Sequence, residues 1–150
     1  MKLSLLQENL NTALTNVSRF VSSKNQLPIL NNILLSTDNG RLKLSATNLE
    51  LSINYWIGAK IEEEGSITIP SREITEFVSY LTPGKIDLSL KGDSLLNLAS
   101  SKTESTFTTN PSTDYPDFPT INPETCFELD LSVLSQAVSQ IAFSAAVEGS

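Results

Sequence analysis

The stretch Leu49-Glu50-Leu51-Ser52-Ile53-Asn54-Tyr55-Trp56-Ile57-Gly58-Ala59-Lys60-Ile61 decides the character of this chain. Apolar side chains occupy every odd-numbered position from 49 to 61, and most side chains between them are polar or small. Successive side chains of a β-strand point to opposite faces, so this alternation is typical of a strand that buries one face. We therefore predict a strand over residues 49–61, the clearest strand signal in the sequence.

Turn signals on both sides of this stretch predict hairpins. Asp38-Asn39-Gly40 is a strong hairpin turn, because Asn and Gly tolerate the positive φ angles of a type I′ loop. It separates an apolar stretch, residues 27–35, from alternating residues 42–46. Gly92-Asp93-Ser94 separates two further alternating runs, 86–90 and 96–98. Short strands are also predicted at residues 1–5 and 67–69 and around Phe107, so the sheets should be mostly antiparallel.

Two segments show the periodicity of an amphipathic helix. The first covers roughly residues 8–22, with apolar side chains three and four positions apart: Leu10, Ala13, Leu14, Val17 and Val21. The second has its apolar side at Ile74, Phe77, Val78 and Leu81, with Ser71 as a predicted N-cap and Pro83-Gly84 as its end. Antiparallel sheets with both helices packed on one side place the chain in the α+β class.

The C-terminal part of the chain repeats its beginning. Four prolines between positions 111 and 123 predict an extended connector, and we place a domain boundary near residue 121. Beyond it, Leu134, Ala137, Val138 and Ile141 repeat the first helix at an offset of 124 positions. We therefore expect a complete domain over residues 1–121 and the start of a second, similar domain over residues 122–150. The sequence leaves open whether Ser150 is a natural end.

Composition excludes several classes of function. Ten basic against 17 acidic residues give a net charge of −7, which excludes a binder with a strongly basic face but allows contact with DNA through a few cations. The absence of histidine excludes His triads, and a single cysteine, Cys126, excludes an internal disulfide and a Cys-rich metal site. No apolar run approaches the roughly 18 residues of a membrane span. We expect a cytoplasmic chain with no membrane partner, metal or cofactor.

Four segments carry a family resemblance. Leu27-Pro28-Ile29-Leu30-Asn31-Asn32-Ile33-Leu34-Leu35 resembles the LPIL-x-N-ILL segment of the bacterial DNA polymerase III β subunit, the sliding clamp. Ala46-Thr47-Asn48-Leu49-Glu50 is similar to that family's A-T-D-L-E, with Asn48 in place of Asp. Gly65-Ser66-Ile67-Thr68-Ile69-Pro70-Ser71-Arg72 resembles its G-x-I-T-V-P-A-R, and Tyr115-Pro116-Asp117-Phe118-Pro119 resembles the end of its first domain.

The resemblance implies a DNA-clamp fold of repeated domains, each with two helices, and a function without catalysis. Such subunits pair head to tail as a homodimer ring around duplex DNA and tether the replicative polymerase. A ring that slides should avoid strong phosphate contacts, so weakly charged helices suit its lining. DNA polymerase III core and the clamp loader would bind through a cleft that this chain does not contain.

The resemblance also implies roles for individual residues. Lys24 and Arg72 match DNA-facing cations of the family, although Lys24 stands where Arg is usual and lacks the bidentate guanidinium. Arg19, close to Lys24, is our own addition to this cationic lining. Phe107 matches an aromatic residue of the subunit interface, which Thr106 and Thr109 would flank on an edge strand. Glu148 falls near a DNA-contacting position, but a carboxylate is a poor phosphate partner and we assign it no role.

Two other functions stay open at this point. The first is a small, self-contained α+β interaction module with no role on DNA, which explains the composition but leaves the repeat and the four motifs unexplained. The second is an enzyme, whose best carboxylate pairs are Asp114 with Asp117 and the run Glu62–Glu64. Neither pair converges from separate elements, as acid–base catalysis requires, and the six glycines form no phosphate-binding loop.

Overall fold

The computed structural model describes residues 1–21, 27–118 and 128–145 of the chain. The chain divides into two compact units, Met1–Phe118 and Pro119–Ser150, and each is described here by itself. None of the helices in the described part of the chain combines the length and the apolar character that crossing a bilayer requires.

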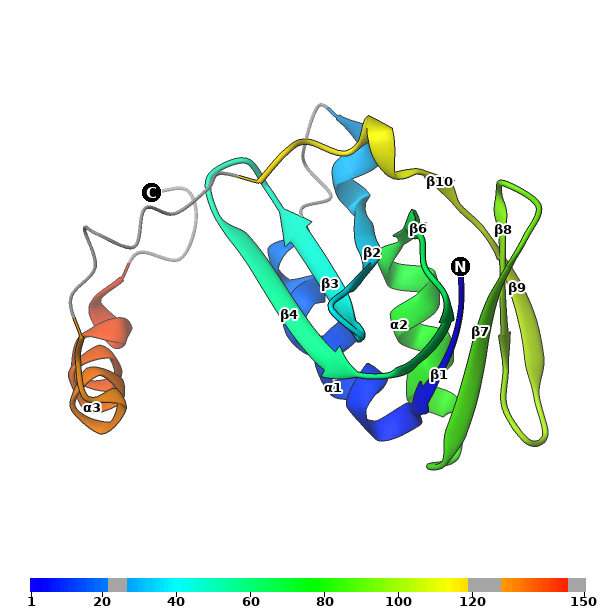
Figure 1. Cartoon of the computed structure of the whole chain (residues 1–150). Coiled ribbons are helices and arrows are strands. Elements are labelled where there is room, and N and C mark those ends of the chain that lie inside the picture. Colours follow the sequence, from blue (N-terminus) through cyan, green and yellow to red (C-terminus); the bar gives the residue numbers. More distant parts are fainter. Residues whose placement is uncertain (22–26, 119–127, 146–150) are drawn as a thin grey trace. The chain divides into compact units, whose positions relative to one another are not determined.

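The first unit is built on two antiparallel sheets, each with five strands in the described residues (Figure 1). One sheet has the order β5-β1-β7-β8-β9, and the other has the order β10-β6-β2-β3-β4. The first sheet consists of β1 (Lys2–Leu6), β5 (Lys60–Glu63), β7 (Lys85–Lys91), β8 (Leu95–Ala99) and β9 (Glu104–Thr108). The second consists of β2 (Asn32–Asp38), β3 (Arg41–Thr47), β4 (Ser52–Gly58), β6 (Ser66–Pro70) and β10 (Asn110–Pro111).

Two helices complete this unit, as the α+β class requires. Helix α1 (Gln7–Val17) contacts β3 and β4, and helix α2 (Ser71–Tyr80) contacts α1 and β6. Figure 1 shows both helices on the same side of the sheet that contains β3 and β4. Their apolar sides and the inward faces of both sheets form one core, so a single hydrophobic cluster holds the unit together. Its fully buried members include Leu10, Leu14, Leu35, Leu44, Ile69, Ile74, Ile86 and Leu88.

The predicted hairpins are confirmed in register and in backbone geometry. Strands β2 and β3 pair from Asp38 opposite Arg41, and the two residues between them have positive φ angles, 49° at Asn39 and 74° at Gly40. Both angles are those of a type I′ turn. Strands β7 and β8 form the second hairpin, from Lys91 opposite Leu95.

The predicted strand over residues 49–61 is wrong as one continuous strand. It divides at Ala59 into β4, which pairs with β3, and β5, which pairs with β1 in the other sheet. The alternation of buried and exposed side chains continues across the division: Ile57, Ala59 and Ile61 are more buried than the residues between them. Leu49 and Leu51, in contrast, precede β4 and are 62% and 61% exposed.

Four local expectations also need correction. Residues Pro28–Asn31 form a 3₁₀ helix before β2, not the start of a strand, since Pro28 presets its first turn. Helix α1 ends at Val17 and continues as a 3₁₀ helix, Ser18–Phe20, instead of reaching residue 22. The N-cap of α2 is Pro70, and Ser71 is its first helical residue. The proline-rich segment begins with β10 and a 3₁₀ helix, Ser112–Asp114.

Tyr115 fastens the end of the first unit to its second sheet. Its side chain is 6% exposed, and its hydroxyl donates to the Asn32 carbonyl oxygen at 3.2 Å and accepts from the Thr47 amide nitrogen at 3.3 Å. Asn32 lies opposite Pro70, whose nitrogen has no hydrogen to donate, so the tyrosine supplies a donor there. Burial raises the pKa of the Tyr115 hydroxyl, and the hydrogen bond from Thr47 opposes this in part.

The described residues of the second unit form one helix and one 3₁₀ helix. Helix α3 (Leu131–Ile141) begins at Asp130, whose carboxylate accepts from the backbone nitrogens of Ser132 and Val133. The Ser132 hydroxyl also donates to this carboxylate, and this bond, followed by the two backbone hydrogen bonds, lowers the pKa of Asp130. A 3₁₀ helix, Ala142–Ser144, follows. Both elements begin and end 124 residues after α1 and the 3₁₀ helix Ser18–Phe20, so the same local structure occurs twice.

Candidate nucleic-acid interface

Helices α1 and α2 lie side by side and run in opposite directions. At one end, the Gln7 side-chain nitrogen donates to the Val78 carbonyl oxygen at 2.8 Å, and this bond is buried. The Gln7 backbone nitrogen also donates to the Gly84 carbonyl oxygen at 2.8 Å. The start of α1 is therefore tied to the end of α2. The buried Gln7 side chain, which the apolar periodicity does not reveal, fixes the two helices against each other.

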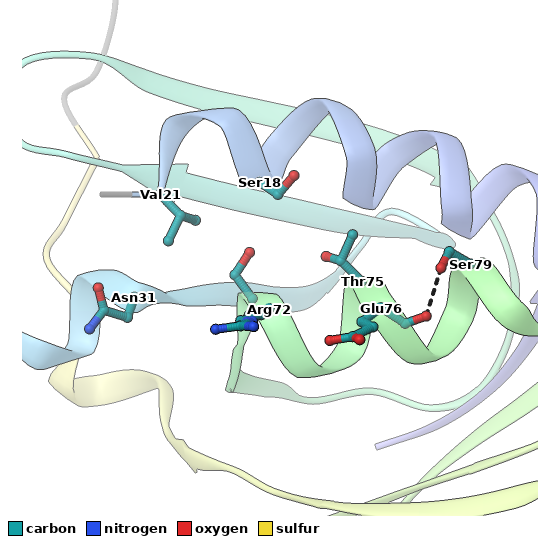
Figure 2. Close-up of a pocket in the computed structure, with 8 residues that line it drawn as sticks. Ser18, Val21, Asn31, Arg72, Thr75, Glu76 and Ser79 are labelled. Atoms are coloured by element: carbon teal, nitrogen blue, oxygen red, sulfur yellow. Dashed lines mark hydrogen bonds between the residues drawn. The ribbon is translucent and has the colours of Figure 1, made fainter. Parts of the chain in front are cut away.

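A groove opens where α1 ends and α2 begins (Figure 2). Its volume is about 620 Å³. Figure 2 shows Arg72 and Glu76 on α2 across from Ser18, which follows the last residue of α1. The Ser79 hydroxyl donates to the Glu76 carbonyl oxygen at 2.7 Å, so it is directed back to its own helix. The lining is Ser18, Val21, Asn31, Ser71, Arg72, Thr75, Glu76 and Ser79.

The structure brings two of the three predicted cations to this pair of helices. Arg72 is exposed in the first turn of α2 and lines the groove. Arg19 is exposed in the 3₁₀ helix that follows α1. Lys24 lies outside the described residues, as does Glu148. Because the end of α1 meets the start of α2, Arg19 and Arg72 belong to the same end of the helix pair.

The exposed side of the helix pair is weakly charged overall. Its acidic residues are Glu8 on α1 and Glu73 and Glu76 on α2, all exposed. Three carboxylates against the two arginines leave one net negative charge. Residues four apart on a helix share a side, so the sequence spacing of Arg72 and Glu76 already indicated that an acid lies beside this arginine. The family motif ends at Arg72 and does not include Glu76. Glu73 and Glu76 lie on the same helix as Arg72 and close to it, so they weaken the attraction of the two arginines for an anion.

The residues expected at a subunit interface lie at and beside an outer strand. In the described part of the chain, β9 has one sheet neighbour, β8. Thr106 is exposed on β9, and its hydroxyl donates to the Asn97 side-chain oxygen at 3.4 Å. Thr109 follows the strand and is 3% exposed. The backbone edge of β9 is thus available for pairing with another strand.

Phe107 belongs to the core of the first unit. Its side chain is 7% exposed, and its ring packs edge-on against Phe77 with 5.3 Å between ring centroids. A ring buried to this degree offers little surface to a second subunit. Any contact that β9 makes with a partner therefore involves its backbone edge and exposed neighbours such as Thr106 more than the Phe107 ring.

One of the carboxylates considered for acid–base chemistry is engaged in an ion pair. Among the described residues, no group of three or more Cys, Asp or Glu side chains is close enough to hold a metal ion. Glu62 is engaged by Lys2 at 2.8 Å, and this ion pair and hydrogen bond lower the Glu62 pKa and raise the Lys2 pKa. The carboxylates considered earlier for acid–base chemistry therefore include one that forms a surface ion pair.

Comparison with known proteins gives a consistent result. Residues 1–120 match the family model described as the DNA polymerase III beta subunit, N-terminal domain. The beta sliding clamp of Synechococcus elongatus is 32% identical over 146 residues, which cover 95% of this chain and 39% of that protein. The chain thus spans about two fifths of the length of such relatives.

Solved structures agree in fold over most of the chain. The Caulobacter crescentus pol III beta structure has a TM-score of 0.84 at 29% identity and covers all of this chain and 40% of its own. The Helicobacter pylori beta clamp bound to a DNA ligase peptide has a TM-score of 0.85 at 26% identity, over 95% of this chain and 40% of its own.

Proposed function

The chain belongs to the DNA polymerase III beta subunit family, and from this premise we propose that it is part of a DNA sliding clamp. In this role it has no catalytic activity. It contributes to a ring that encircles duplex DNA and tethers the replicative polymerase during chromosomal replication in the cytoplasm. The observation that carries the proposal is the family match over residues 1–120, which includes both helices of the candidate interface.

We propose that residues 1–121 are the first clamp domain and that residues 122–150 begin the central one. The recurrence of an 11-residue helix and a three-residue 3₁₀ helix at an interval of 124 residues supports this division. A clamp built from repeated domains requires each repeat to restart with the same strand and helix. The apolar side of α3, with Leu134, Ala137, Val138 and Ile141, would be covered by further strands of the same domain.

The proposed DNA-facing surface is the exposed side of α1 and α2. Arg72 and Arg19 would contact phosphates at one end, with Lys24 as a further cation of the same lining. Exposed Glu8, Glu73 and Glu76 would limit the strength of the attraction. Because each strong phosphate contact adds affinity and a strong dependence on salt, a surface with few cations and nearby carboxylates favours weak, sequence-independent association. Such association is compatible with sliding.

For the ring itself, we propose that the outer edge of β9 meets a second subunit, head to tail, in a homodimer. Thr106 would lie at this contact, Thr109 beside it and Phe107 beneath it as support. DNA polymerase III core and the clamp loader would bind the complete subunit through a cleft outside this chain. An unpaired strand edge is a ready site for pairing with another strand, which supports the use of β9 for this purpose.

A ¹⁵N NMR titration of the 150-residue chain with a short DNA duplex at low salt tests the DNA-facing surface. We expect the amide shifts to concentrate in residues 7–20 and 71–80 and to decrease with salt. The double variant Arg19→Gln/Arg72→Gln should bind several-fold more weakly. Lys60→Gln/Lys102→Gln changes the net charge equally on exposed residues outside these helices and should bind like the wild type. Equal losses in both variants, or shifts confined to other elements, would contradict the assignment.

A further inference from the structure

The outward face of β3 and β4 carries a cluster of cations and aromatic rings, which we call the Trp56 patch: Arg41, Lys43, Trp56 and Phe118. Lys43 and Trp56 are direct cross-strand partners. Their neighbours along the strands, Leu42 and Ile57, are buried in the core. Because side chains alternate along a strand, the patch lies on the sheet face opposite the core and the two helices. Trp56 is 39% exposed there.

Cationic side chains of the chain itself lie over both rings of this patch. The Lys43 ammonium nitrogen lies 5.3 Å from the centre of the Trp56 ring and 6.0 Å from that of Phe118, and the Arg41 guanidinium carbon lies 5.9 Å from the Trp56 ring. These distances are within the range of cation–π attraction. Phe118 also stacks on Tyr115 at 6.0 Å. The rings therefore position the two cations.

The two cations have no carboxylate partner among the described residues. Asp38 is the acid beside them in the sheet, opposite Arg41. Its two carboxylate oxygens accept from the Trp56 ring nitrogen and from the Asn39 side-chain nitrogen, each at 2.7 Å. Lys2, Lys85 and Lys91, in contrast, each form an ion pair. Within the described part of the chain, no carboxylate therefore competes with an external anion for the donors of Arg41 and Lys43.

We propose that the Trp56 patch is a docking site for an acidic peptide segment of a partner protein. Carboxylates of the segment would pair with Arg41 and Lys43, and the exposed part of Trp56 would pack against its side chains. Single-stranded nucleic acid fits less well, because base stacking needs free ring faces. Cations already lie over both rings of the patch, and Phe118 also stacks on Tyr115. The patch is also on the far side of the sheet from α1 and α2, so it acts independently of the proposed DNA-facing surface.

The site contains its own probe, because Trp56 is the single tryptophan of the sequence. Titration of the 150-residue chain with a decaglutamate peptide at low salt should change the Trp56 emission saturably. Substitutions beside Trp56 can alter its emission directly. For these variants, affinity is measured by the fluorescence anisotropy of the same peptide labelled with fluorescein. We expect Arg41→Gln/Lys43→Gln to bind about tenfold more weakly, the loss of two exposed charge pairs.

The control variant is Lys60→Gln/Lys102→Gln, which removes the same charge from exposed residues elsewhere and should retain wild-type affinity. Unchanged urea midpoints will show that both variants fold. The proposal is overturned if decaglutamate does not bind saturably, if Arg41→Gln/Lys43→Gln binds as tightly as the wild type, or if the control loses as much affinity. A ten-residue thymidine oligonucleotide that binds more tightly than decaglutamate through the same two cations would also overturn it, in favour of nucleic acid.

Discussion

Replacing Tyr115 with phenylalanine removes one oxygen atom where the end of the first unit is fastened to its second sheet. The ring of the variant can keep its place beside Phe118, with 6.0 Å between ring centroids, so the change is confined to hydrogen bonding. The Asn32 carbonyl oxygen loses its donor at 3.2 Å, and the Thr47 amide loses its acceptor at 3.3 Å. Both backbone groups belong to buried residues.

The expected cost follows from these two contacts. A buried polar group that loses its partner costs about 1–3 kcal/mol. Both hydrogen bonds are slightly longer than the usual ranges for their donor types, so the loss of each should cost near the lower limit. We expect Tyr115→Phe to lower the free energy of unfolding by about 2–3 kcal/mol. With a urea m-value of roughly 1–3 kcal/mol per M, the midpoint should fall by roughly 1 M or more.

Urea unfolding followed by Trp56 emission measures this loss, because Trp56 lies on β4 in the same unit. The matched control is Tyr80→Phe, since Tyr80 is 82% exposed and its hydroxyl should contribute little. A loss below about 0.5 kcal/mol for Tyr115→Phe would contradict this expectation, because it would mean that water or a small backbone shift replaces the hydroxyl. An equal loss in Tyr80→Phe would refute it as well.

Alkaline pH tests the same residue by another route. Burial raises the pKa of Tyr115 above the ordinary value of 10.0, so the unfolded chain ionises first as the pH rises. The stability that the neutral hydroxyl contributes is fully present below pH 10 and is lost as the pH rises through the higher pKa of the folded state. The slope is at most about 1.4 kcal/mol per pH unit. The difference between wild type and Tyr115→Phe should therefore shrink above pH 10, and a constant difference would contradict this.

Two further substitutions test the packing of the first unit. Gly65→Ala would place a Cβ atom 2.7 Å from the Met1 Cβ, and we expect it to lower the free energy of unfolding by about 1–3 kcal/mol. Gly58→Ala is the control, because its Cβ atom enters open space and should change the free energy of unfolding by less than about 0.5 kcal/mol. Equal urea midpoints for the two variants would contradict the contact between residue 65 and Met1. Phe107→Ala removes the ring that packs against Phe77 and should cost about 3–5 kcal/mol in the same assay. A loss under about 1 kcal/mol would place Phe107 outside the core.

Local chemistry was enough to predict the class of the fold. The Asn39-Gly40 turn requires only two residues that tolerate positive φ, and the structure has both. The apolar spacing in α1 and α2 reports directly which side of each helix is buried. Arg72 could be assigned to an exposed helix start from its motif, because that placement depends on residues next to it in the chain.

Interactions between distant segments could not be predicted in this way. Arg72 shares its groove with Ser18 only because α1 and α2 run in opposite directions, which the buried Gln7–Val78 hydrogen bond fixes. Among the described residues, Arg41 and Lys43 have no carboxylate partner, and this likewise depends on Asp38 accepting a hydrogen bond from Trp56 across β3. Neither relation leaves a periodic signal in the sequence.

Residue spacing alone was therefore enough to predict which side of α1 and α2 is buried and where the first hairpin turns. Contacts between distant segments set the division of residues 49–61 between two sheets at Ala59, and they place Phe107 in the core from an outer strand. The physical reason is that alternation has a period of two whichever neighbour a strand pairs with. The choice of neighbour depends on packing between residues far apart in the chain, which only the folded protein brings together.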